Sequence, residues 1–123
     1  MGNKTILVID DSMIDFLYVK AILAHGGYRV VHAPSGKDGI EEAKRNLPDC
    51  ILMDVVMPEM NGFQATRALS REVTTADIPV LMLSSKSQET DRVWAQRQGA
   101  KDYLVKPADP RKLLEKLKLL LGS

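Results

Sequence analysis

Short apolar runs alternate with longer segments of mixed polarity along the chain. The runs lie at residues 6–9, 29–33, 50–53, 79–83 and 102–105. Several are rich in valine and isoleucine, and a short continuous apolar run is typical of a strand that is buried on both faces of a sheet. The pattern therefore predicts five buried strands.

The segments between these runs carry the start and stop signals of helices. A residue that can cap a helix N-terminus precedes each segment, and glycine or proline follows several of them. The predicted caps are Ser12, Ser35, Asn61, Ser87 and Asp109, and the predicted stops are Gly26-Gly27, Pro48 and Gly99. After Ser12 and Ser35, an aspartate three residues further on resembles a capping box.

Five strands that alternate with five helices predict an α/β fold. This order favours a parallel sheet, and right-handed crossovers then place helices on both faces in a doubly wound arrangement. The fourth helix has few apolar residues, namely Val93, Trp94 and Ala95. It is expected either to be loosely held, and so able to move, or simply to be exposed.

The amino-acid composition mainly tells which classes of function are disfavoured. The 123 residues carry 17 basic and 16 acidic side chains, a balance that gives no indication of binding to nucleic acid or to a membrane surface. The single cysteine, Cys50, lies in an apolar run and is expected to be a buried free thiol. With no signal peptide and no apolar run of membrane length, we expect one cytoplasmic domain over residues 1–123 without an output domain.

Charged residues follow the predicted strands at the end where open α/β sheets bind their ligands. Asp10 and Asp11 follow the first strand, Asp54 follows the third, and Lys106 follows the fifth. If these three strands are central neighbours, three carboxylates and one ammonium share a pocket. Repulsion among the carboxylates then favours a cation, and oxygen ligands suit Mg²⁺. A carboxylate held there can also act as a nucleophile and form an aspartyl phosphate.

Each of these residues has a simpler interpretation when it is taken alone. Asp11 can cap a helix beside Ser12, Asp54 can form a turn, and Lys106-Pro107 can end a strand. Their joint placement at strand carboxyl ends favours one functional site over several separate accidents.

Four motifs together resemble the receiver domain of response regulators, of the CheY-like type. They are Asp10-Asp11-Ser12, residues 53–58 (MDVVMP) with Asn61-Gly62, Leu83-Ser84-Ser85, and residues 103–107 (YLVKP). Their order and spacing match the family from Lys4 to Leu121. The resemblance implies a flavodoxin-like strand order 2-1-3-4-5 and a binding module that is controlled by phosphorylation, rather than an enzyme that acts on a separate substrate.

The resemblance also implies a role for each residue at the acidic site. Asp54 is the expected phosphoacceptor. Mg²⁺ is expected on Asp11, Asp54 and the backbone carbonyl of Val56, with Asp10 acting through a metal-bound water. Lys106 is expected to pair with Asp54 at rest and with the phosphoryl group afterwards, and its bond to Pro107 is expected to be cis.

Further residues are implied in the response to phosphorylation. Ser84 is expected to bond a phosphoryl oxygen, and Tyr103 is expected to rotate inward when Ser84 moves. The fourth helix, fifth strand and fifth helix would then present a new face to a protein partner. Trp94 is a candidate contact on that face, with a tryptophan lying flat over the sheet edge as the alternative.

A narrower resemblance is to the PilH receivers of type IV pilus chemosensory systems. It is carried by residues 61–67 (NGFQATR), 88–94 (QETDRVW) and 97–100 (RQGA). It implies a CheA-like histidine kinase, or its phosphotransfer domain, as the phosphoryl donor and a role in twitching motility. The output protein is left open, and the chain is expected to be a monomer or a weak dimer.

Other functions are considered on the same residues. Haloacid-dehalogenase phosphatases need an acidic residue two positions after the nucleophile, where this chain has Val56, so an enzyme of that class is disfavoured. Asp10-Asp11-Ser12 would repel the phosphate of FMN, which disfavours a flavodoxin-like cofactor binder. A receiver that binds partners without phosphorylation stays open. Because Val56 cannot orient a hydrolytic water, we expect slow loss of the phosphoryl group, and Ser85 is expected to obstruct access to it in part.

Overall fold

The computed structural model describes residues 3–122, and within them the chain forms one five-stranded parallel sheet. The strand order is β2-β1-β3-β4-β5, as predicted. In chain order the elements are β1 (Thr5–Ile9), α1 (Met13–His25), β2 (Arg29–Ala33), α2 (Gly36–Asn46), β3 (Cys50–Met53), α3 (Gly62–Arg71), β4 (Val80–Ser84), α4 (Glu89–Gln98), β5 (Asp102–Val105) and α5 (Pro110–Leu121). The doubly wound α/β fold is confirmed.

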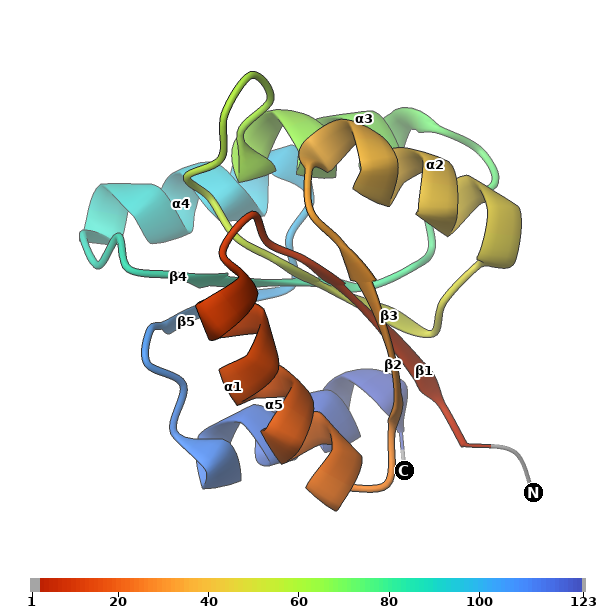
Figure 1. Cartoon of the computed structure of the whole chain (residues 1–123). Helices are drawn as coiled ribbons and strands as arrows, with labels where there is room; N and C mark the ends of the chain where they lie inside the picture. The colour runs from red at the N-terminus through yellow and green to blue at the C-terminus, as the bar shows by residue number, and fades with distance from the viewer. Residues whose placement is uncertain (1–2, 123) are drawn as a thin grey trace.

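Helices cover both faces of the sheet, so the molecule has three layers. Helices α1 and α5 lie on one face, and α2, α3 and α4 lie on the other (Figure 1). Alternate residues of a strand point to opposite faces, and the two cores follow this rule: Leu7 and Ile9 belong to one, whereas Ile6 and Val8 belong to the other. The strands β1, β3 and β4 are therefore buried on both faces, which explains their continuous apolar sequence. The prediction of burial is wrong for β2 and β5, which are only partly buried because they lie at the edges of the sheet.

The helix starts follow the local sequence at four of the five predicted caps. Ser12, Ser35, Asn61 and Asp109 each accept a hydrogen bond from a backbone N–H in the first turn. The prediction for Ser87 is wrong. The α4 helix is capped one residue later at Gln88, whose backbone N–H donates to Asp91 Oδ2 at 3.1 Å, so an acidic partner inside the first turn decides where this helix begins.

Strand β4 starts one residue later than its apolar run indicated. Pro79 has no N–H to give to a ladder, although its carbonyl still accepts a hydrogen bond from Ile51 at 2.9 Å. The strand therefore begins at Val80 and reaches as far as Ser84. Ser84 is the last residue of the strand and so lies at the carboxyl end of the sheet.

The three strands that carry the acidic residues and the lysine are not all neighbours at the centre of the sheet. Strands β1 and β3 are neighbours, but β5 is the edge strand beyond β4. Lys106 follows this edge strand, its N–H bonds the Ser84 carbonyl at 2.8 Å, and its bond to Pro107 is cis as predicted. The lysine therefore reaches the acidic residues by the length of its side chain, not because its strand adjoins theirs.

Two further observations concern the rest of the chain. Cys50 is a fully buried free thiol, as predicted, and burial raises its pKa to about 12. Among the helices in the described residues, none combines the length and the apolar character that crossing a membrane requires.

Candidate functional site

Two buried aspartates stand side by side where the central strands end. Ile9 and Met53 are register partners at the ends of β1 and β3, so Asp10 and Asp54 follow at the same level. The backbone continues the ladder here, because the Asp54 N–H donates to the Ile9 carbonyl at 3.0 Å. Both carboxylates are largely buried, which brings two acidic groups together where water has little access.

The loop that follows Asp54 is held against α3 by a close backbone approach. The Gly62 N–H donates to the Val55 carbonyl at 2.8 Å. A Cβ atom on Gly62 would overlap the Asp54 carbonyl oxygen, so the first residue of α3 must lack a side chain for this approach. The Asn61 cap and Gly62 therefore help to fix the backbone of Asp54.

The acidic residues fit the requirements of a divalent cation. Asp10, Asp11 and Asp54 each offer one carboxylate oxygen, and these three oxygens lie within 4.8 Å of one another. Asp11 is exposed while the other two are buried, so the cluster opens to solvent on one side. An all-oxygen set with an open side suits Mg²⁺, which keeps several waters when bound to proteins.

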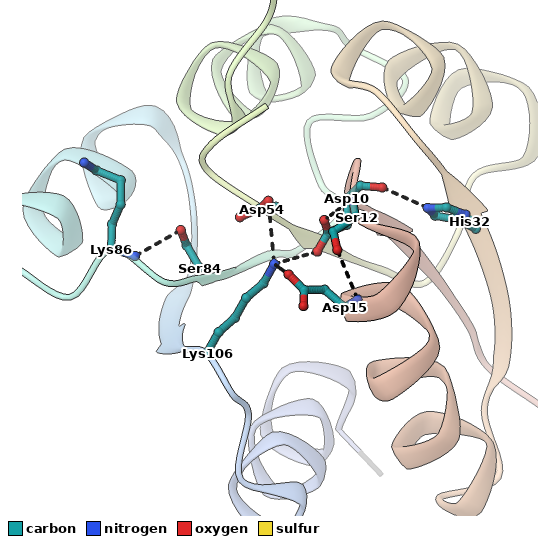
Figure 2. A network of polar contacts seen from close by, with 8 residues as sticks. All are labelled: Asp10, Ser12, Asp15, His32, Asp54, Ser84, Lys86 and Lys106. Atoms are coloured by element: carbon teal, nitrogen blue, oxygen red, sulfur yellow. Dashed lines mark hydrogen bonds and ion pairs between the residues drawn. The ribbon is translucent and has the colours of Figure 1, made fainter. Parts of the chain in front are cut away.

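Lys106 lies at the centre of an ionic network with three carboxylates (Figure 2). Its Nζ atom lies 2.7 Å from Asp10 Oδ2, 2.8 Å from Asp15 Oδ2 and 3.6 Å from Asp54 Oδ2. The first two contacts are hydrogen bonds, whereas the third is an ion pair beyond hydrogen-bond distance. The expected resting pair of Lys106 with Asp54 is therefore the weakest of the three contacts.

Asp15 is a site residue whose contact with Lys106 the sequence did not reveal. Its pattern after Ser12 suggested a capping box, but only half of the box forms as predicted: Ser12 Oγ accepts from the Asp15 N–H at 3.2 Å. The Ser12 N–H donates instead to Asp10 Oδ1 at 2.9 Å, and the Asp15 carboxylate turns to Lys106. The signal in the sequence was an acidic residue in the first turn of the helix that follows β1.

Burial and charge shift the acid–base properties of this site in a consistent direction. Burial raises the pKa of Asp54 to about 6, and the neighbouring Asp10 charge adds to the effect, while Lys106 opposes it. Burial alone would lower the pKa of Lys106, but the hydrogen bonds to Asp10 and Asp15 outweigh burial and raise it. The site therefore holds an ammonium beside a carboxyl group that gives up its proton reluctantly.

Ser84 and Ser85 differ sharply in their exposure. Ser84 is fully buried, and its Oγ accepts a hydrogen bond from the Lys86 N–H at 3.3 Å. Ser85 is exposed and lines a pocket with Asp15, Lys106 and Pro107. The serine at the end of β4 is thus the one whose hydroxyl is enclosed by the fold.

Tyr103 is buried in the structure, so its ring already occupies an inward position. Its hydroxyl donates to the Lys86 carbonyl at 2.7 Å, and burial raises its pKa. Arg92 on α4 donates to the Tyr103 carbonyl at 3.1 Å and lies 5.5 Å from the ring centre. The sequence did not single out Arg92, because nothing local places it over a residue of β5.

The two remaining predicted residues are exposed. Trp94 on α4 is 47% exposed and lines a shallow groove with Val93 and Arg97. Val56, two residues after Asp54, is 59% exposed. Their expected roles, in partner contact and in metal binding through the Val56 carbonyl, stay predictions.

Comparison with known proteins gives consistent results. The model of the response regulator receiver domain matches residues 6–118. Protein PilH of Pseudomonas aeruginosa is 47% identical over 96% of this chain and 98% of its own length. The chemotaxis protein CheY4 of Vibrio cholerae superposes with a TM-score of 0.91 at 31% identity, covering 98% of this chain and 100% of that one.

A solved receiver domain bears on the acidic cluster. The receiver domain of the sensor histidine kinase PA1611 of Pseudomonas aeruginosa, determined with a magnesium ion in its active-site cleft, has a TM-score of 0.91. It is 30% identical, and the match covers 99% of this chain and all of that one. Because the family model spans most of the sequence and a relative is nearly half identical over almost its whole length, the chain belongs to the response regulator receiver domain family of two-component signalling.

Proposed function

We propose that this receiver accepts a phosphoryl group on Asp54 from a histidine kinase, with Mg²⁺ as cofactor. The observation that carries the proposal is the convergence of three carboxylate oxygens within 4.8 Å with the Lys106 ammonium beside them. Receiver family membership and the magnesium-bound PA1611 relative support this assignment. The protein would act in signalling and catalyse only its own phosphorylation and dephosphorylation.

The chemistry requires an ionised Asp54 and neutralisation of charge. One Asp54 oxygen attacks phosphorus and forms an O–P bond, and the bond from phosphorus to the leaving group breaks. The leaving group departs with the electron pair of that bond. For a phosphohistidine donor the leaving group is an imidazole nitrogen, which then takes a proton. The chain contributes Lys106 and Ser84 as hydrogen-bond donors to the phosphoryl oxygens. When bound, Mg²⁺ would be held by Asp11, Asp54 and the Val56 carbonyl, with Asp10 through water, and would neutralise charge on those oxygens.

Phosphorylation would bias a two-state equilibrium through Ser84 and Tyr103. A phosphoryl group draws the Ser84 hydroxyl away from the Lys86 amide, with which it is now bonded at 3.3 Å. The Lys86 carbonyl is in turn the acceptor for the Tyr103 hydroxyl, so the change passes to β5 and α4. The resulting α4-β5-α5 face, with Trp94 exposed on it, would bind an output protein.

The PilH relative supports a biological context for this chemistry. We infer a CheA-like histidine kinase, or its phosphotransfer domain, as the donor, and chemotaxis-like control of twitching motility as the setting. The chain would work in the cytoplasm as one receiver domain over residues 1–123, as a monomer or weak dimer, without binding nucleic acid or inserting into a membrane.

The test is the intact-protein mass after incubation with acetyl phosphate and Mg²⁺. The expected result is a gain of one phosphoryl group that requires Mg²⁺ and is lost in Asp54→Asn. A gain that persists in Asp54→Asn would overturn the assignment of the phosphoacceptor. No gain and no Mg²⁺ binding would instead favour a receiver that binds its partner without phosphorylation.

A further inference from the structure

The hydrogen bonds of Lys106 are committed to carboxylates other than the proposed phosphoacceptor. An ammonium has three hydrogens, and Asp10 and Asp15 engage it at 2.7 and 2.8 Å. Asp54 Oδ2 stands 3.6 Å away, within ion-pair range only. Figure 2 shows Asp10, Asp15 and Asp54 arranged around the one nitrogen atom. Two of the three ammonium hydrogens are therefore engaged by Asp10 and Asp15, and these two partners set where Nζ stands relative to Asp54.

Burial indicates which partner can be exchanged. The Asp10 side chain is 5% exposed, whereas that of Asp15 is 45% exposed. A buried carboxylate that loses its cation is left with a large desolvation cost, but a half-exposed one is rehydrated at once. Asp15 can therefore release Lys106 cheaply, while Asp10 keeps its hold and prevents the lysine from leaving the site.

The backbone of Asp15 stays in place whichever way its side chain turns. Its N–H is capped by Ser12 Oγ at 3.2 Å in the first turn of α1. The Asp15 side chain can therefore change its rotamer while its backbone stays in place. It also lines a pocket of about 390 Å³ with Ser85, Lys106 and Pro107, so the exchange takes place next to solvent.

We propose that Asp15 is a positioning residue that holds Lys106 away from Asp54 in the resting protein, and that the phosphoryl group displaces it from the lysine. The proposal rests on the phosphoacceptor role proposed above for Asp54. Asp15 acts through Lys106 and not on phosphorus, because its contact is with Nζ. Its removal should leave the lysine anchored by Asp10 and free to bond Asp54 or its phosphoryl group.

The first measurement is the rate constant of phosphorylation by acetyl phosphate with Mg²⁺. Asp15→Asn is expected to react about two- to fivefold faster, the range that corresponds to one partly exposed ion pair. Asp15→Glu, which keeps the carboxylate, should stay close to the wild type. The matched control is Asp38→Asn, because Asp38 occupies the same position in α2, its N–H capped by Ser35 Oγ at 3.1 Å, and its loss changes net charge equally.

Lys106→Met separates an effect through the lysine from a general effect of charge at the pocket. In this background, Asp15→Asn should no longer accelerate the reaction. An equal acceleration with and without the lysine would overturn the proposal, since Asp15 would then act only by repelling the anionic donor. An unchanged or slower rate for Asp15→Asn in the native background would overturn it as well.

The second measurement does not depend on phosphorylation. Exchange of the Lys106 ammonium hydrogens with water, followed by nitrogen-15 NMR, should be severalfold faster in Asp15→Asn than in the wild type or Asp38→Asn. Unchanged exchange would show that Asp15 does not hold the lysine and would overturn the proposal. Two results together would separate this proposal from the proposed function. If the wild type takes up no phosphoryl group, and exchange is nevertheless faster in Asp15→Asn, the role of Asp54 as phosphoacceptor is contradicted while the contact of Asp15 with Lys106 stands.

Discussion

The backbone of Lys86 connects Ser84 to Tyr103 through two hydrogen bonds. Its N–H donates to Ser84 Oγ at 3.3 Å, and its carbonyl accepts from the Tyr103 hydroxyl at 2.7 Å. A single peptide segment thus joins the end of β4 to the ring on β5. A movement of the Ser84 hydroxyl removes the acceptor of the Lys86 N–H. The Lys86 backbone can then shift, and with it the acceptor of the Tyr103 hydroxyl.

Removing the Tyr103 hydroxyl should loosen this connection without emptying the core. Tyr103→Phe keeps the buried ring and loses one hydrogen bond, so we expect a loss of about 1 kcal/mol in the free energy of unfolding. In the same variant, the amide resonances of Lys86 and Ser87 should shift in an NMR spectrum, because the Lys86 carbonyl, which forms one peptide group with the Ser87 N–H, has lost its donor. Urea denaturation and a two-dimensional amide spectrum measure the two effects.

Tyr18 provides a matched control for this prediction. Its hydroxyl also donates to a backbone carbonyl, that of Ala108, at 2.8 Å. Because Tyr18 is 45% exposed, Tyr18→Phe should cost no more free energy of unfolding than Tyr103→Phe, and it should leave the Lys86 amide in place. Equal shifts of that amide in both variants would contradict the connection.

The buried carboxyl of Asp54 should weaken the fold when it ionises. Its pKa is raised from 3.8 to about 6 by burial and by Asp10. Because the folded state holds the proton more tightly than the unfolded chain, this group destabilises the protein progressively as pH rises from about 4 to about 6. At 1.36 kcal/mol for each pKa unit, the cost above pH 6 is about 2 to 3 kcal/mol.

Asp54→Asn should therefore be more stable than the wild type at pH 7.5 and equally stable near pH 4. The measurement is urea denaturation at both pH values in the absence of Mg²⁺, with Asp38→Asn as the control for an exposed aspartate. The exposed site should change the free energy of unfolding by less than about 0.5 kcal/mol at either pH. An Asp54→Asn advantage that is the same at both pH values would exclude the ionisation of Asp54 as its cause.

Gly62 should tolerate no side chain, because it lies against the backbone of the proposed phosphoacceptor. A Cβ atom there would stand 2.8 Å from the Asp54 carbonyl carbon and 2.9 Å from Val55 Cα, besides overlapping the Asp54 carbonyl oxygen. These are backbone atoms that cannot rotate away. We expect Gly62→Ala to cost about 1 to 3 kcal/mol in the free energy of unfolding and to slow phosphorylation by displacing Asp54.

Gly36→Ala is the comparison for this effect. Gly36 is also the first residue of a helix, but a Cβ atom there would meet the Met60 side chain at 3.1 Å from Cγ and Sδ and the Met60 carbonyl oxygen at 3.2 Å, farther than any of the backbone contacts at Gly62. A flexible methionine can shift, so the cost should be smaller than at Gly62. Urea denaturation decides the matter, and a larger loss for Gly36→Ala would contradict the backbone argument.

The parts of the fold that could be predicted from the sequence are those that depend on residues close together in the chain. The burial of β1, β3 and β4, four helix caps and the strand order followed from apolar runs, capping residues and family motifs, whereas the burial predicted for β2 and β5 did not hold at the edges of the sheet. The meeting of Asp10 with Asp54 was predictable because neighbouring parallel strands end at the same edge of the sheet. The start of α4 was not predictable in this way, because the helix begins after Gln88, whose N–H bonds the Asp91 carboxylate, and not after a hydroxyl cap at Ser87.

Contacts between residues far apart in the chain could not be predicted in the same way. Asp15 and Lys106 are 91 residues apart, and their pairing depends on the rotamer of each side chain. Arg92 meets Tyr103 only because α4 packs over β5. Such contacts depend on packing and leave no periodic trace in the sequence.

Val56 should determine how long the phosphoryl group persists on Asp54. Its side chain is 59% exposed two residues after Asp54, and an isopropyl group cannot hold a water by hydrogen bonding. An asparagine at this position can orient a water for attack on phosphorus. We expect Val56→Asn to lose its phosphoryl group about two- to tenfold faster than the wild type, the range that one hydrogen bond of ordinary strength supplies.

The measurement is the decay of the phosphorylated mass after acetyl phosphate is removed, with Mg²⁺ present. Val73→Asn is the matched control, because Val73 is a 91% exposed valine in the segment after α3. Its substitution repeats the chemical change away from Asp54 and should leave the decay rate unaltered. Decay that is equal or slower in Val56→Asn would mean that the residue at position 56 does not limit access of water, and the exposed Ser85 hydroxyl beside Lys106 would become the next group to remove.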